Sequence, residues 1–106
     1  MIKVRLFKDE KAKLNGFEVQ GHAGYEDAGK DIVCAGVSAI IFGGMNAIAY
    51  YYHQDASKFQ VELKEGYTYL KLTDKATAEV QTVLETIEIQ LKTIEETYGQ
   101  YIKIID

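Results

Sequence analysis

From Asp31 to Tyr52 the sequence reads DIVCAGVSAIIFGGMNAIAYYY, the longest mostly apolar run in the chain. Its length alone would suit a membrane-spanning helix. The run stands alone, however, with a carboxylate at one end and an imidazole at the other. Small or polar residues also interrupt it at Gly36, Ser38, Gly43, Gly44 and Asn46. We therefore expect a helix in a protein core, whose small residues allow close packing, and no membrane span.

Two hairpins lie on either side of this helix. Residues 2–8 and 17–22 alternate apolar and polar side chains, which is the period of a half-buried strand. The polar turn between them ends in Asn15-Gly16, a strong hairpin signal. Residues 58–64 and 67–73 alternate in the same way around a tight turn at Glu65-Gly66. Four strands are therefore expected, two before the helix and two after it.

The C-terminal third predicts a second helix and a last strand. Asp74 has the character of an N-cap with Thr77 at N3, and Gly99 is expected at the C′ position. The apolar stripe between them has helical spacing: Val80, Val83, Leu84, Ile87, Leu91, Ile94 and Tyr98. Residues 101–105 then form a short strand. The prediction is an α+β fold in ββαββαβ order, one domain over residues 1–106, with an antiparallel or mixed sheet and two long helices.

Composition excludes several classes of protein. The net charge of −4 and the pI near 5.2 argue against direct nucleic-acid binding by phosphate neutralisation. Any association with the ribosome or RNA would have to go through a protein partner or a small local patch. A single cysteine excludes a disulfide framework and a multi-cysteine zinc site, and we predict no metal or cofactor. The N-terminus has no signal-peptide apolar region. We expect a cytoplasmic protein without a membrane segment.

Chemistry concentrates around the one cysteine. If Asp31 is the helix N-cap, Cys34 lies at N3, where the helix dipole and a nearby His22 imidazolium favour a thiolate. Asp31 itself would serve either as the cap or to orient His22, and Ser38 follows Cys34 by one turn on the same helix face. On these residues alone, a reactive thiol and a small buried hydrophobe are about equally supported.

The run Gly21-His22-Ala23-Gly24, followed by Gly29-Lys30-Asp31-Ile32-Val33-Cys34-Ala35 and Ser38, resembles the ribosomal-processing cysteine protease family Prp. The resemblance extends over essentially the whole chain. It implies an enzyme that removes a short N-terminal extension from a bacterial large-subunit ribosomal protein without a metal. Cys34 would be the nucleophile and His22 the general base and then the general acid.

The resemblance also implies a homodimer and an active-site loop over residues 23–30. Gly21, Gly24 and Gly29 would let this loop act as a gate for substrate. Two other classes stay open beside the protease. One is a thiol redox sensor or thioester-handling protein, and the other is a non-catalytic ribosome-associated binding module.

Overall fold

The computed structural model describes residues 1–21 and 28–105. Within them the predicted ββαββαβ order is confirmed, with one short 3-10 turn, η1, added before the third strand. The elements are β1 (Ile2–Lys8), β2 (Leu14–Gln20), α1 (Ala28–Tyr51), η1 (Ala56–Lys58), β3 (Phe59–Lys64), β4 (Tyr67–Leu72), α2 (Ala78–Tyr98) and β5 (Ile102–Ile105).

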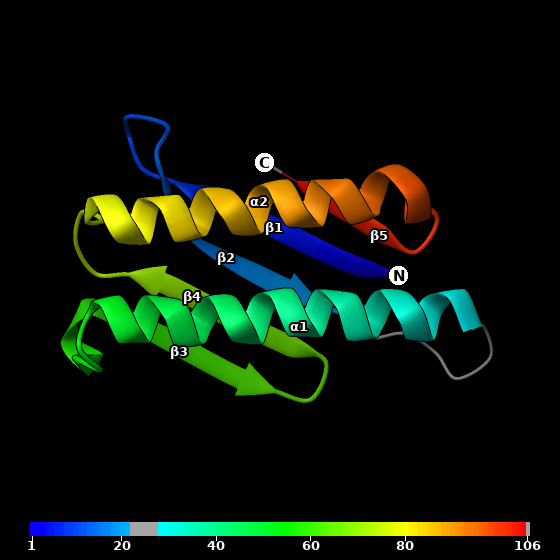
Figure 1. Ribbon diagram of the computed structural model, residues 1–106, viewed down its shortest axis with the longest axis horizontal. Coiled ribbons are helices and arrows are strands. Elements are labelled where there is room, and N and C mark those ends of the chain that lie inside the picture. The colour runs from blue at the N-terminus through cyan, green and yellow to red at the C-terminus, as the bar shows by residue number, and fades with distance from the viewer. Residues whose placement is uncertain (22–27, 106) are drawn as a thin grey trace.

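The five strands form one mixed sheet in the order β3-β4-β2-β1-β5. Only the β1–β5 pair is parallel, and the three other pairs are antiparallel. Figure 1 shows α1 and α2 side by side on the same face of the sheet, running in opposite directions. The molecule therefore has two layers, and the other face of the sheet carries no helix among the described residues.

The core fills the space between the helices and the sheet. Alternate strand residues point toward the helices, and the register places Val4 beside Val19 and Leu6 beside Phe17. The largest fully buried side chains come from both α-helices and from four of the five strands: Phe17, Ile41, Ile48, Leu70, Leu84, Leu91, Ile102, Val4, Val33 and Val80. The stripe predicted for α2 is confirmed, since four of its residues are buried and three are half-buried.

Only one face of the apolar helix α1 packs in the protein core. Ile32–Tyr51 is long and apolar enough to cross a membrane by length and composition. Its inner face packs in the core through Val33, Val37, Ile41 and Ile48, as expected for a core helix. At Gly44 the two helices approach so closely that a Cβ would overlap the side chain of Ile87. The outer face of α1 is exposed.

The predicted first hairpin is confirmed, but its turn ends before Leu14, so the expected end of the turn at Asn15-Gly16 was wrong. The Asp9 carboxylate accepts hydrogen bonds from the backbone amides of Lys11 and Lys13, at 2.8 and 3.0 Å. Ala12 supplies the left-handed residue, with φ of 62°. Gly16 instead lies inside β2, where a Cβ would overlap the Leu70 carbonyl oxygen of β4. Because Gly16 has no side chain, β2 and β4 can approach closely at this position.

Helix α1 begins at Ala28, three residues before the predicted start. Residues 28–30 of the expected loop, including Gly29, therefore belong to the helix, and residues 23–27 lie outside the described residues. Asp31 lies within the first turn and is not the N-cap. Cys34 lies in the second turn and not at N3, so its own amide belongs to the helix interior, where amides bond to the carbonyl four residues back.

The ends of α2 also differ from expectation. Thr77 is the N-cap, and its hydroxyl accepts a 3.2 Å hydrogen bond from the amide of Val80. Asp74 lies before the helix and accepts a bond from the amide of Lys75. Gly99 is the C-cap itself, in a right-handed conformation with φ of −59°, and not a left-handed C′ residue. The Thr77 hydroxyl, close to the start of the apolar stripe at Val80, was therefore a better predictor of the N-cap than the Asp74 carboxylate.

Candidate active site

Cys34 lies where α1 meets the end of β2 and the β3–β4 turn. Its neighbours Val33 and Val37 are buried, whereas Cys34 is half-buried and its thiol is free of any disulfide. It lines a pocket of about 180 Å³. A half-buried thiol at the wall of an open pocket can be reached by a substrate, which a thiol sealed in the core could not be.

Three sequence segments build this pocket. Of the predicted site residues, the structure brings Cys34, Ser38 and Gly21 together here. Further along α1, apolar side chains extend the wall, and the hairpin of β3 and β4 closes the opposite side. The remaining lining residues are Val19, Val37, Ile41, Phe42, Lys64, Gly66, Tyr67 and Thr68.

The hairpin wall was missed by sequence reasoning. Lys64, Tyr67 and Thr68 lie about thirty residues after Cys34 in the sequence, and their alternation indicated only a strand. The sheet brings them near because β4 pairs with β2 and places Tyr67 opposite Gln20. Nothing in the local pattern could have shown that pairing.

Gly21 occupies a position that only glycine fits. Its φ is +92°, and a Cβ there would overlap the carbonyl oxygen of Met1. Its amide donates a 2.9 Å hydrogen bond to the carbonyl oxygen of Gly66. The chain thus leaves β2 in a fixed direction beside the pocket, immediately before His22.

The other predicted site residues have different positions. His22 and Gly24 lie outside the described residues. Gly29 and Asp31 lie in the first turn of α1, one turn before Cys34 along the helix. The pairing of Cys34 with His22 and the gating role of the glycines stay predictions.

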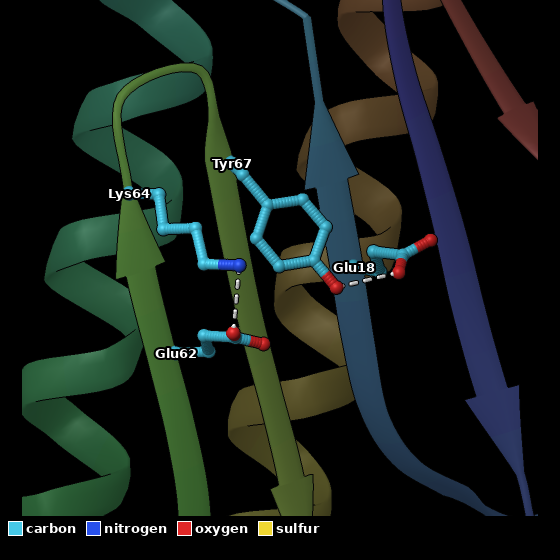
Figure 2. Close-up of polar contacts among 4 residues, drawn as sticks. All are labelled: Glu18, Glu62, Lys64 and Tyr67. Atoms are coloured by element: carbon cyan, nitrogen blue, oxygen red, sulfur yellow. Dashed lines mark hydrogen bonds and ion pairs between the residues drawn. The ribbon is translucent and has the colours of Figure 1, made fainter.

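A polar cluster covers the sheet beside the pocket. Figure 2 shows the ring of Tyr67 lying across the sheet, with Lys64 and Glu62 on one side and Glu18 on the other. The Tyr67 hydroxyl donates a 2.7 Å hydrogen bond to Glu18, which raises the pKa of Tyr67 to about 12. Lys64 Nζ is 3.0 Å from Glu62 and 5.6 Å from the centre of the Tyr67 ring. The pocket rim is therefore fixed by polar contacts.

A larger hollow of about 520 Å³ lies elsewhere, between the β1–β2 turn and the start of α2. It is lined by neither the cysteine nor a histidine, so it offers no Cys–His pair. Among the described residues, no group of three or more His, Cys, Asp or Glu side chains could hold a metal ion. Although the Cys34 pocket is smaller than this hollow, its thiol makes it the better candidate for the active site.

The family model described as "Cysteine protease Prp" matches residues 1–103. The ribosomal processing cysteine protease Prp of Staphylococcus aureus is 33% identical over 104 residues, covering 98% of this chain and 97% of the relative. The protein of that name from Bacillus subtilis is 29% identical over 112 residues, covering 98% and 96%.

Two solved structures of the Staphylococcus aureus protease superpose closely. One, with a covalently linked product peptide, has a TM-score of 0.83 at 32% identity and covers 99% of this chain and 98% of that one. The other, with a substrate peptide, has a TM-score of 0.84 at 31% identity, covering 98% and 97%.

A two-layer α+β fold with an accessible thiol, matched over its full length by peptidases, defines a cysteine protease. The chain belongs to the Prp family of ribosomal processing cysteine proteases.

Proposed function

We propose that this chain cuts a short N-terminal extension from a bacterial large-subunit ribosomal protein, with Cys34 as the nucleophile and His22 as its base. The observation that carries the proposal is the Cys34 pocket, because Gly21 in its wall directly precedes His22. The relatives named as ribosomal processing proteases, one of them holding a covalently linked product peptide, support it.

The proposed reaction has two steps. The Cys34 sulfur attacks the scissile carbonyl carbon, and the His22 imidazolium gives a proton to the leaving amine, so that a thioester forms. His22 then takes a proton from water, and the hydroxide formed displaces the thiolate to release the new carboxylate. Both protons pass through His22, and no metal or cofactor is needed.

The oxyanion requires a donor other than the Cys34 amide, because that amide lies in the second turn of α1. Ser38 lines the same pocket one turn further along the helix. We assign its hydroxyl to the oxyanion. Loss of one such donor costs about 3 to 4 kcal/mol of transition-state stabilisation.

Substrate enters the pocket between α1 and the β3–β4 hairpin. Its inner wall is apolar, with Val19, Val37, Ile41 and Phe42, and its rim carries Lys64 and Tyr67. Burial of a charged side chain against such a wall would cost free energy, so an uncharged residue next to the scissile bond fits best.

A thiol redox sensor is the competing class, since it also needs an accessible Cys34. The two are separated by a synthetic peptide that spans the junction between the extension and the mature ribosomal protein. The protease account predicts turnover of this peptide under reducing conditions and its loss after alkylation of Cys34. Reversible oxidation of Cys34 without any cleavage would instead support the sensor.

The proposed functional unit is a homodimer that joins through the two helices. No Asp, Glu, Lys or Arg occurs from Ile32 to Tyr52, and Ile32, Tyr50 and Ile89 are 60%, 69% and 65% exposed. A groove of about 440 Å³ lies in this face between α1 and α2. The outer face of α1 and the lining of this groove are uncharged, whereas the glutamates of α2 lie outside the groove. Uncharged apolar surface of this kind is typical of interfaces.

Sedimentation equilibrium tests the dimer. The wild type should sediment at twice the monomer mass, and the Ala39→Glu, Ile89→Glu double variant at the monomer mass. Ile105→Glu, a similar change on the exposed sheet face, should leave the dimer intact. A monomeric wild type contradicts this part of the proposal. We also propose a cytoplasmic location, where ribosomal proteins are made.

A further inference from the structure

The uncovered face of the sheet has a charge opposite to that of the whole chain. Residues that alternate with the buried ones point away from the helices. Five of them are cations, namely Lys3, Arg5, Lys64, Lys71 and Lys103, and two are the carboxylates Glu18 and Glu62. This face therefore carries a surplus of three positive charges, although the net charge of the chain is −4.

The two carboxylates are already engaged within the face. Glu18 accepts the Tyr67 hydroxyl and lies 3.3 Å from the Gln20 amide, and Glu62 pairs with Lys64. In contrast, within the described part of the chain no ion pair or hydrogen bond holds the side chains of Lys3, Arg5 and Lys103. Three exposed cations are thus free to meet an external anion.

Register places three of the five cations, Lys64, Lys3 and Lys103, in one row across the sheet, whereas Arg5 lies in the next row beside Glu18. Lys64 lies beside Tyr67, Tyr67 beside Gln20, Gln20 beside Lys3, and Lys3 beside Lys103. At a strand spacing of about 4.8 Å, this row crosses about 19 Å of sheet, enough to follow several consecutive phosphates. It begins at the rim of the Cys34 pocket.

Aromatic rings lie among these cations. Phe7 and Tyr69 have ring centres 5.6 Å apart, and Lys71 Nζ is 5.7 Å from the centre of Phe7. Both rings are half-buried and supported by the sheet. Flat rings with interspersed cations can stack bases while the cations meet the phosphates, whereas an acidic peptide would use the cations alone.

We propose that this open sheet face binds single-stranded RNA, with Lys3, Arg5 and Lys103 on the phosphates and Phe7 and Tyr69 under the bases. The net charge of the whole chain argued against direct nucleic-acid binding. The negative charges of α2 and the loops outweigh this positive face in the net charge, which therefore did not reveal it. None of these five residues lines the Cys34 pocket, so failure of this proposal would leave the proposed protease unaffected.

Fluorescence anisotropy with a labelled single-stranded RNA oligonucleotide tests the phosphate contacts. The wild type should bind at about 50 mM salt and weaken steeply toward about 200 mM. In the Lys3→Gln, Arg5→Gln, Lys103→Gln variant, the slope of log K against log salt should fall by about two, the share of three single-strand phosphate contacts. The matched variant Lys11→Gln, Lys13→Gln, Lys75→Gln has the same net charge and should bind as the wild type does.

Tyr69→Ala tests the stacking. It should weaken RNA binding by about tenfold or more and leave the binding of heparin, a polyanion without bases, unchanged. Circular dichroism and cleavage of the junction peptide report that each variant is folded. Three results would overturn the proposal: no RNA binding by the wild type at low salt, equal losses in the two triple variants, or unaltered RNA affinity in Tyr69→Ala.

Discussion

The backbone amide of Gly21 donates a 2.9 Å hydrogen bond to the carbonyl oxygen of Gly66, which joins the end of β2 to the β3–β4 turn. Both glycines line the Cys34 pocket. The bond therefore fixes the far wall of the pocket to the point where the chain departs toward His22. Gly21 holds its positive φ between this bond and the carbonyl of Met1.

Gly21→Ala should reduce stability and cleavage together. A Cβ at a φ of +92° is strained, and it would also push against the Met1 carbonyl. Strain of this kind costs about 1 to 3 kcal/mol. Urea denaturation and peptide cleavage measure the two effects. Gly43→Ala is the control, because a Cβ there meets nothing within 4 Å and a helical alanine should raise stability by up to about 1 kcal/mol. Wild-type stability and cleavage in Gly21→Ala would contradict this role.

The Tyr67–Glu18 contact should make stability depend on alkaline pH. Because the hydrogen bond to Glu18 raises the pKa of Tyr67 to about 12, the folded state holds this proton more tightly than the unfolded state does. The stabilisation is complete below pH 10 and is lost as the pH rises from 10 to about 12.

Thermal melts across this range, compared with Tyr67→Phe, isolate the contribution. Tyr67→Phe removes the titrating hydroxyl while keeping the ring, so the difference in stability between the two proteins should shrink above pH 10. A difference that stays constant up to pH 12 would show that the contact does not control the titration.

Asp31→Asn should lower kcat by about tenfold or more while KM changes little if the carboxylate orients His22, the second of the two roles that the sequence leaves open for it. The helix starts at Ala28, so loss of an N-cap cannot explain such a fall. Loss of an acid from the first turn should reduce stability only by about 0.3 to 1 kcal/mol. Asp31→Glu should recover part of the kcat. If Asp31→Asn cleaves the peptide at the wild-type rate, the carboxylate serves the helix alone.

Gly44→Ala should destabilise the chain because its Cβ would overlap Ile87 of α2. Overpacking of a core contact costs about 1 to 3 kcal/mol. Ile87→Val in the same chain removes a methyl group from this contact and should recover part of the loss. Denaturation of the two single variants and the double variant measures the coupling, and purely additive losses would refute it.

Periodicity in the sequence predicted the elements of this fold well, and capping signals predicted their ends poorly. Alternation identified the first four strands, a short apolar run identified the fifth, and the stripe from Val80 to Tyr98 identified α2 and its buried face. By contrast, Asn15-Gly16 looked like a turn but lies in β2, and Asp74 looked like a cap three residues before the true cap. Such short polar signals depend on contacts with distant strands, as Gly16 shows by its approach to Leu70.

The site was predictable where its residues are neighbours in sequence. Cys34, Ser38 and Gly21 could be grouped from the motif, and they do share one pocket. The wall formed by Lys64, Tyr67 and Thr68 could not be grouped with them, because it depends on the pairing of β4 with β2. The positive charge of the open sheet face could not be predicted either, because its residues come from separate strands that are brought together only by strand pairing.

Intact-protein mass spectrometry tests the central claim most directly. The chain is incubated with the extended ribosomal protein, with Cys34→Ser and His22→Ala as matched variants and a buffer-only control. The account predicts that wild type converts the substrate into two fragments at a single peptide bond, and that neither folded variant does so. A substrate left uncut by folded wild-type protein, or cleavage that persists in Cys34→Ser, would contradict it.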